Sequence, residues 1–187
     1  MNYFISDLHL GHKNVIGFDR RPFFDLQDMH ASIIKNWNDV VTAKDTVYIL
    51  GDVAWKDDTA LAILPQLKGK KVLILGNHDN RLNKSLALFE SVHPYLELNR
   101  DGEFLVLSHY PMHVWNRSRY GAVHLYGHVH NNHEQDIILQ HNEIMKVETL
   151  EHECYNVGCM MPYMGYTPRT LSEIRLRFKK YMQNRKE

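Results

Sequence analysis

Five short apolar runs, each followed directly by polar residues, recur along the chain. They lie at residues 3–6, 46–50, 71–75, 104–107 and 123–126. Runs of this length that are rich in apolar residues and end at a turn are typical of buried strands. The pattern therefore predicts a strand in each run, with polar side chains at its carboxyl end.

Two helical patterns separate the first three predicted strands. Apolar residues at helical spacing run from Leu26 to Val41. Residues 57–68 hold a second stripe, which we expect Pro65 to shorten and Gly69 to end. Strands that alternate with helices are typical of βαβ units, in which ligands bind beyond the carboxyl ends of the strands. The first half of the chain is thus predicted to be α/β.

The second half of the chain lacks this regular alternation. Residues 144–150 and 154–157 are predicted to be strands, and mixed or antiparallel pairing is expected because no long helix separates most of the later strands. A capping box at Thr170 and Glu173 predicts a final helix from about Leu171. That helix is rich in Lys and Arg, which fits either a solvated face or a contact with nucleic acid.

Composition narrows the classes of protein that the chain resembles. Its 187 residues fit one domain spanning residues 1–187. Basic and acidic residues balance at 22 each, so no overall basic field favours nucleic acid or a membrane surface. Two cysteines form neither a zinc pattern nor a disulfide framework, which predicts a reducing, cytoplasmic compartment. No apolar run is long enough to span a membrane, and the first strand begins too early to leave room for a signal peptide.

The chemistry lies in the polar residues that follow the apolar runs. Asp7 and His9, like His128 and His130, are two residues apart, a spacing that directs both side chains to one side at the end of a strand. Seven residues at the strand ends are candidate metal ligands: Asp7, His9, Asp52, Asn77, His109, His128 and His130. Carboxylate, amide and imidazole donors without thiolate suit manganese, iron, zinc or magnesium.

Seven donors exceed what one ion uses when water is also bound. They suit two ions that share a bridging carboxylate and lie about 3.5–4 Å apart. For single residues other roles stay open, because Asp7 and Asp52 could cap backbone amides and His109 could be a packed core histidine. Further histidines are assigned to surface or packing positions, namely His30, His93, His124, His133, His141 and His152, with His12 and His113 as possible supports for the ligands.

The ordered set of strand-end motifs resembles that of the calcineurin-like metallophosphoesterase superfamily. The matching motifs are Asp7-Leu8-His9, Gly51-Asp52, Gly76-Asn77-His78-Asp79, His109 and Gly127-His128-Val129-His130. Further segments resemble a small bacterial and phage branch with a single phosphoesterase domain, namely Arg21-Pro22-Phe23, Ser108-His109-Tyr110-Pro111-Met112 and Asn156-Val157-Gly158. Arg20 departs from the asparagine that is more usual there.

The resemblance implies an α/β fold, a four-layered α/β/β/α sandwich of two mixed sheets flanked by helices. It implies that two divalent metal ions, with manganese favoured, are bound as follows: Asp7, His9 and His130 at the first, Asn77, His109 and His128 at the second, and Asp52 bridging both. His78 would act as general acid on the leaving oxygen, with Asp79 orienting it. A metal-bridging hydroxide would then hydrolyse a phosphate ester.

The substrate class stays open at this point. A phosphomonoester, a phosphodiester, a nucleotide and a nucleic acid all fit, and Arg21, Asn116 and Arg117 are candidate substrate contacts. The alternatives are a nuclease that acts on nucleic-acid ends or strands, and a catalytically silent scaffold that binds metal and partners. The intact His78 argues against the scaffold, because metal binding alone does not require it.

Overall fold

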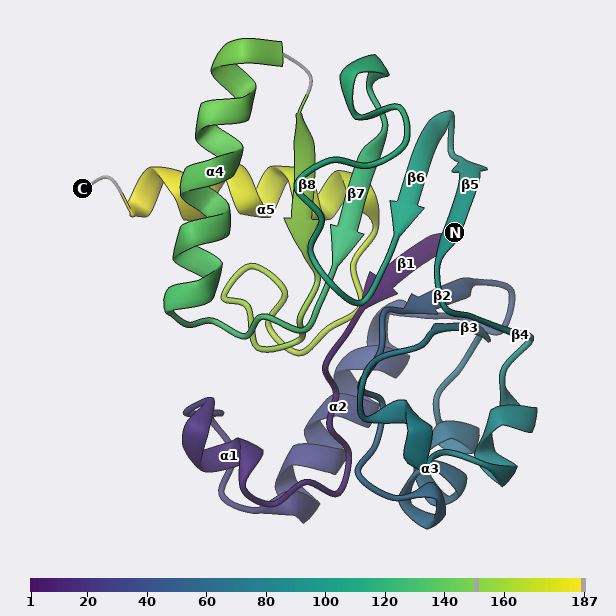
Figure 1. The fold of residues 1–187 in the computed structure, drawn as a ribbon. Helices are drawn as coiled ribbons and strands as arrows, with labels where there is room; N and C mark the ends of the chain where they lie inside the picture. The colour runs from purple at the N-terminus through teal and green to yellow at the C-terminus, as the bar shows by residue number, and fades with distance from the viewer. Residues whose placement is uncertain (150–151, 186–187) are drawn as a thin grey trace.

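The computed structural model describes residues 1–149 and 152–185, and it contains two four-stranded sheets with helices outside them (Figure 1). The first sheet has the order β1-β2-β3-β4 and the second β5-β6-β7-β8. The strands are β1 (Asn2–Ile5), β2 (Thr46–Ile49), β3 (Lys70–Ile74), β4 (Ser91–His93), β5 (Leu96–Arg100), β6 (Glu103–Leu107), β7 (Val123–Tyr126) and β8 (Glu153–Asn156).

Five α-helices and four short 3-10 helices connect these strands in the described residues. The α-helices are α1 (Val15–Phe18), α2 (Leu26–Val40), α3 (Asp57–Ile63), α4 (His133–Thr149) and α5 (Leu171–Asn184). The 3-10 helices are η1 (Leu64–Gln66), η2 (Asp79–Arg81), η3 (Lys84–Leu88) and η4 (Ser118–Tyr120). As predicted, α3 stops before Pro65, and Thr170 with Glu173 forms a capping box at the start of α5.

The pairing of the strands aligns their carboxyl ends. In the first sheet the paired strands are parallel, and Ile5 lies opposite Ile49, which in turn lies opposite Leu73. In the second sheet β6, β7 and β8 are parallel, whereas β5 is antiparallel to β6. Just after β1, Ser6 forms a parallel bridge with Gly158, which follows β8. This bridge brings the strand ends of the two sheets together.

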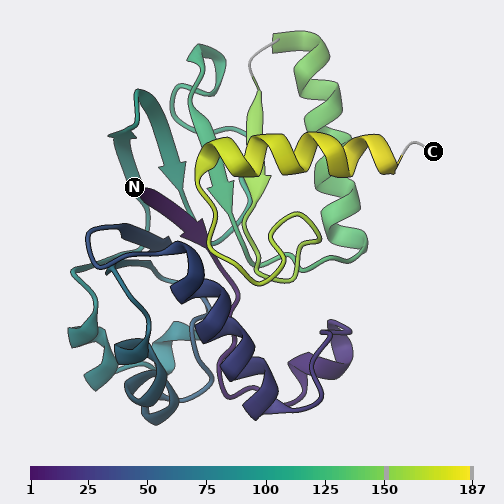
Figure 2. The same ribbon diagram turned by 180° about the vertical axis from the view of Figure 1, so that it is seen from behind.

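Helices pack on both faces of the second sheet. Figure 2 shows α5 crossing in front of β7 and β8, and in this layer Phe178 packs against Tyr155 with ring centroids 5.1 Å apart. On the other face, Ile138 of α4 belongs to a separate apolar cluster with Tyr126 and Cys154. The first sheet is covered by α2, which buries Met29, Ile33 and Trp37. The predicted α/β fold of two sheets flanked by helices is confirmed.

The strand predicted at residues 144–150 is wrong. Residues up to Thr149 belong to α4, and Leu150 lies outside the described residues. The helix is stabilised at its start by Asn132, whose side-chain oxygen accepts hydrogen bonds from the backbone of Glu134 and Gln135. Its buried residues Gln135, Ile138, Leu139 and Asn142 follow helical spacing. The side chains of this segment that pack on the second sheet thus follow the period of a helix and not that of a strand.

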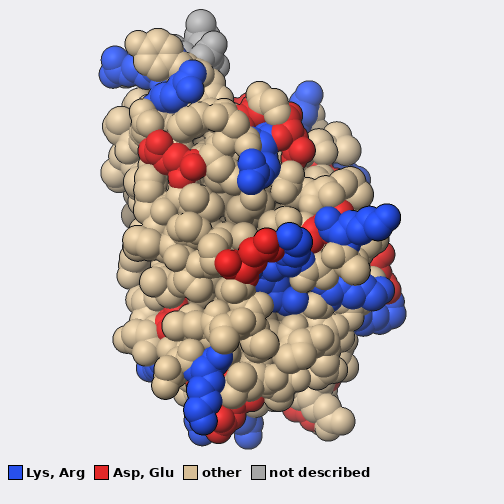
Figure 3. Space-filling model, turned by 90° about the vertical axis from the view of Figure 1, so that its right-hand side faces the viewer, with Lys and Arg blue, Asp and Glu red and all other residues tan. Residues whose placement is uncertain are grey.

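The surface carries charges of both signs. Figure 3 shows basic and acidic side chains interspersed over the face that lies on the right-hand side of Figure 1. Several of them pair, as Lys70 does with Glu90 at 2.9 Å. Within residues 1–149 and 152–185, no helix combines the length and the apolar character needed to cross a membrane.

Candidate metal centre

The turns that leave the strands have an unusual backbone. Asp7, His9, Asp52 and His128 all have positive φ, between 49° and 68°. Such a conformation costs about 1–3 kcal/mol at each residue and persists only where the surrounding structure enforces it. Four candidate ligands therefore lie on backbone that is held in place at a cost, and the turns direct their side chains towards one another.

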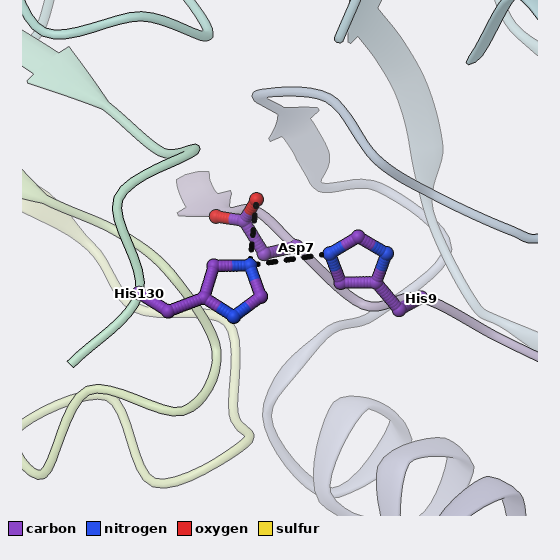
Figure 4. A group of neighbouring side chains, drawn as sticks. All are labelled: Asp7, His9 and His130. Carbon is purple, nitrogen blue, oxygen red and sulfur yellow. Dashed lines mark hydrogen bonds and ion pairs between the residues drawn. The ribbon is translucent and has the colours of Figure 1, made fainter. Parts of the chain in front are cut away.

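The first group of donors consists of Asp7, His9 and His130, whose ligand atoms all lie within 4.8 Å of one another. Figure 4 shows the side chains of Asp7 and His9, from the end of β1, facing His130 from the loop after β7. The Nε2 atoms of the two histidines are 3.3 Å apart, and Nε2 of His130 lies 3.9 Å from Oδ1 of Asp7. These three donors surround a space of the size that one metal ion takes.

The second group shares a carboxylate with the first. Asp7, Asp52 and His109 also have ligand atoms within 4.8 Å of one another. Oδ2 of Asp52 lies 3.6 Å from Nε2 of His109 and 3.7 Å from Nε2 of His9, so it stands between the two groups. Oδ1 of Asn77 is 3.1 Å from Nε2 of His109 and 3.0 Å from Nδ1 of His128. All seven predicted ligands thus lie in one connected cluster.

Burial makes these donors suited to a cation. Asp7 and Asp52 are almost fully buried, and burial raises the pKa of the Asp7 carboxyl despite the nearby imidazoles of His109 and His130. Burial, assisted by the charge of Arg21, lowers the pKa of His9 to about 2. A buried carboxylate beside an uncharged imidazole such as that of His9 lacks a counter-charge there, and a divalent ion supplies one. The donor set therefore fits divalent metal ions that accept oxygen and nitrogen ligands.

Glycine is required where the strand ends approach each other. A Cβ atom on Gly76 would lie 2.7 Å from the backbone nitrogen of Asp52, and one on Gly127 would lie 2.6 Å from Oδ2 of Asp7. Neither contact is possible without moving the backbone or a ligand. The glycines in the motifs therefore allow the carboxylates to sit directly against the neighbouring turn.

His78 occupies a different position from the ligands. It does not belong to either group of three donors, and its side chain is 32% exposed. Its Nε2 atom lies 3.9 Å from Oδ2 of Asp52, so the imidazole stands at the edge of the cluster. On its outer side the ring of Trp55 lies 5.3 Å away, and the guanidinium of Arg81 stacks on that ring at 3.6 Å. The sequence analysis missed Trp55 and Arg81, because neither belongs to a motif.

Asp79 contacts the backbone of the metal turns, and no contact between its carboxylate and His78 is found in the described residues. The carboxylate accepts hydrogen bonds from the backbone nitrogens of Asp52 at 2.9 Å, Val53 at 2.9 Å and Gly76 at 2.8 Å. The side chain is 1% exposed, and burial raises its pKa although the three bonds counteract this. Asp79 thus fastens the turn after β2 to the turn after β3.

Arg21 lies behind the first group of donors. Its guanidinium is buried and donates to the backbone carbonyls of Asp7 and Leu8, each at 2.9 Å. It also pairs with Asp19 at 2.9 Å, and Asp19 in turn bonds Nδ1 of His130. Arg21, expected to contact substrate, is thus occupied by the protein itself. Asp19, which the sequence analysis missed, fixes the ring so that Nε2 faces the donors.

The other two candidate substrate contacts lie along the second sheet. Nδ2 of Asn116 donates to Glu97 on β5 at 2.8 Å. The guanidinium of Arg117 lies 4.8 Å from the centre of the Phe104 ring on β6. In the described residues, no hydrogen bond or ion pair joins either side chain to the cluster.

A cavity of about 840 Å³ opens beside the centre. Two of the candidate ligands, His128 and His130, form part of its wall. The remaining lining residues are Phe18, Asp19, Arg20, Pro22, Asn131, Asn132, Met160 and Tyr166. Its volume lies within the range of about 300–1,000 Å³ that small-molecule sites usually have. The centre is therefore accessible to a ligand from this side.

Comparison with known proteins identifies the family. A family model described as "Calcineurin-like phosphoesterase superfamily domain" matches residues 3–170 of this chain. The uncharacterized protein MJ1445 of Methanocaldococcus jannaschii is 37% identical over 134 residues, covering 70% of each chain. The Gene 66 protein of Mycobacterium phage L5 is 34% identical over 145 residues, which cover 74% of this chain and 61% of the phage protein.

A solved structure has the same fold. The protein of unknown function AQ665 from Aquifex aeolicus superposes with a TM-score of 0.68 at 28% identity, and the match covers 94% of this chain and 98% of that one. The family match spans most of the chain, including all the strand-end motifs. This chain belongs to the calcineurin-like phosphoesterase superfamily, whose members typically bind divalent metal ions and hydrolyse phosphate esters.

Proposed function

We propose that this protein hydrolyses phosphodiesters with the help of two divalent metal ions, manganese being the favoured metal. The observation that carries the proposal is the position of Oδ2 of Asp52. This atom lies 3.6 Å from Nε2 of His109, 3.7 Å from that of His9 and 3.9 Å from that of His78. One carboxylate oxygen thus adjoins a donor from each metal group and the exposed imidazole at once.

Seven residues would hold the metal ions and an eighth would donate a proton. Asp7, His9 and His130 would hold one ion, Asn77, His109 and His128 would hold the other, and Asp52 would be shared between them. When bound, two such ions neutralise the charge of a phosphate and activate water as a nucleophile. His78 remains free of both groups and would protonate the leaving oxygen, which is needed because an alkoxide is a poor leaving group.

Two sides of the centre are available for the two ester groups of a diester. The rings of Trp55, His78, His9 and His130 follow one another with centroids 5.3, 5.6 and 5.2 Å apart. The leaving group would lie at the Trp55 end, beside the proton donor. The cavity of about 840 Å³ begins at the His130 end and would hold the other ester group. A phosphomonoester has only one such group and leaves this cavity unused.

The cavity also limits the chemistry of the second ester group. Among the described residues that line it, Arg20 is the only Lys or Arg, and Asn131 and Asn132 add amide groups. Phe18 and Tyr166 add aromatic rings. A substituent with both hydrogen-bonding groups and a planar ring, such as a nucleoside, matches these walls. Basic and acidic residues balance at 22 each over the chain, so no overall basic field favours a long nucleic acid, which is the weaker match.

The test compares hydrolysis of bis-nitrophenyl phosphate and nitrophenyl phosphate with added manganese. We expect faster metal-dependent turnover of the diester, and loss of both bound metal and activity in Asp52→Ala. Asp58→Ala, which removes an exposed carboxylate of α3, is the matched control and should keep both. Bound metal without turnover of either ester would favour the silent scaffold. Faster turnover of the monoester would contradict the proposed substrate class.

A further inference from the structure

Three histidines that are not among the candidate ligands meet on the outer face of the second sheet. His113 lies in the loop after β6, His141 in α4 and His152 just before β8. The ring centroids of His113 and His141 are 4.3 Å apart, and those of His141 and His152 are 6.1 Å apart. The cluster therefore joins three separate segments of the chain through imidazole side chains alone.

Two of these imidazoles carry buried nitrogen atoms without a partner. Nε2 of His141 and Nε2 of His152 are buried and have no hydrogen-bond partner among the described residues. The whole side chain of His152 is only 2% exposed. An unsatisfied buried polar atom costs about 1–3 kcal/mol, so such atoms are rare unless something else binds them. Burial, with the nearby His141, lowers the pKa of His152 to about 4, so its ring is neutral at neutral pH.

Packing explains why the imidazole rings are buried here, but it does not explain why their Nε2 atoms lack hydrogen-bond partners. The ring of Trp115 lies 4.4 Å from that of His152, which is a favourable aromatic contact. However, the indole nitrogen of Trp115 already donates to the backbone of Ala122, so it has no hydrogen to offer. The thiol of Cys154, in the same apolar cluster, forms its hydrogen bond with the side chain of Asn142. Neither neighbour therefore supplies a hydrogen-bond partner for the imidazole nitrogens.

We propose that His113, His141 and His152 bind a late divalent transition-metal ion, with zinc as the best match. Neutral imidazoles are the preferred nitrogen ligands of zinc, and sites with three histidines and one open position are well known for this metal. The exposed His113 leaves room for water as a fourth ligand. The strand-end donors are gathered more tightly, within 4.8 Å. Binding here therefore requires the half-buried ring of His141 to rotate towards the buried His152, and the exposed His113 to follow it.

Zinc at this site would link the loop after β6, the middle of α4 and the start of β8. A metal that binds the folded chain better than the unfolded chain stabilises the fold. The site is independent of the proposed hydrolysis, because none of the three histidines belongs to the strand-end groups. Its loss should therefore leave phosphodiester turnover intact.

The experiment counts zinc ions per chain in the full-length protein by mass spectrometry after equilibration with zinc and gel filtration. We expect His141→Gln and His113→Gln each to hold one zinc ion fewer than wild type, while turnover of bis-nitrophenyl phosphate is unchanged. His133→Gln, an exposed histidine at the start of the same helix, is the matched control and should keep the wild-type zinc content. His113 is itself exposed, so its replacement tests the site without disturbing the core.

Melting temperature provides a second measurement. Added zinc should raise the melting temperature of wild type and His133→Gln by more than that of His141→Gln. Equal zinc content in wild type, His113→Gln and His141→Gln would overturn the proposal. An equal loss of zinc in the His133→Gln control would also overturn it, since the loss would then not belong to the cluster. Failure of the proposed hydrolysis would instead appear as missing turnover in every protein, with the zinc difference unaffected.

Discussion

Replacing Asp79 with asparagine separates two roles that a carboxylate next to His78 can have. If it orients the imidazole, the change affects proton transfer and little else. If it fastens the metal turns together, the change affects stability and metal binding first. The structure favours the second role, because both carboxylate oxygens are occupied by the backbone nitrogens of Asp52, Val53 and Gly76.

The size of the effect follows from these three bonds. An asparagine presents one oxygen and one NH₂ group, so at least one of the three buried backbone donors would face another donor. Each donor left without an acceptor costs about 1–3 kcal/mol, and we therefore expect Asp79→Asn to lower the free energy of unfolding by at least this amount. Replacing a residue that supports a metal ligand typically lowers metal affinity by about 10–100-fold, and we expect Asp79→Asn to lower manganese affinity to a similar extent.

Asp57 offers a matched control for this measurement. Its carboxylate likewise accepts hydrogen bonds from three backbone nitrogens, those of Asn83, Lys84 and Ser85, but these lie at η3. Urea unfolding and calorimetric manganese titration of both variants form the assay. Asp57→Asn should lower stability and keep manganese affinity, whereas Asp79→Asn should lower both. Unchanged stability and metal affinity in Asp79→Asn, with turnover reduced, would refute the fastening role and restore the orienting one.

Three further predictions concern other contacts. Gly127→Ala would place a Cβ atom 2.6 Å from a carboxylate oxygen of Asp7, so manganese affinity should fall at least about tenfold. Gly17→Ala is the control, because its Cβ atom meets nothing within 4 Å, and it should have wild-type manganese affinity in the same titration. Asp19→Asn should weaken manganese binding by about 10–100-fold, because the partner of His130 loses its charge, and wild-type affinity would contradict this. Burial lowers the pKa of His124 from 6.5 to about 4, so the unfolded chain binds a proton at this residue at higher pH than the folded chain does. The free energy of unfolding should therefore fall by up to about 3 kcal/mol as pH drops from 6.5 to 4. Urea unfolding at several pH values should show that His124→Gln lacks this part of the pH dependence.

The strand ends could be predicted because their signals are local. An apolar run that stops at Gly51-Asp52 or Gly76-Asn77 marks both the strand and the point where its chemistry begins. The spacing of two between His128 and His130 is equally visible in the sequence. Parallel pairing then places these ends at one edge, which the structure shows.

Contacts between distant segments gave no such signal. Arg21 looked like a loop cation available to substrate, yet it pairs with Asp19 and binds the backbone at the end of β1. Asp79 looked like a partner of its neighbour His78, yet its bonds reach the turn after β2. Both residues act through backbone groups, and backbone groups carry no sequence pattern.

The misassigned helix α4 has a different cause. The segment 144–150, with apolar residues at Ile144, Met145, Val147 and Leu150, was predicted to be a strand. The helical stripe lies earlier, at Ile138 and Leu139, and it becomes clear only once the apolar cluster on the second sheet is known. The apolar residues that decide the element therefore lie outside the segment 144–150.

The most direct test of the central claim is the dependence of turnover on the leaving group in wild type and His78→Ala. Rates are measured for a series of aryl phosphodiesters whose phenols differ in pKa, with manganese present and its binding checked in both proteins. A shallow dependence in wild type and a steep one in His78→Ala, with equal metal content, is the predicted result. An equal dependence in the two proteins, or loss of metal in His78→Ala, would contradict the role of His78 as the proton donor of a metal-dependent phosphodiesterase.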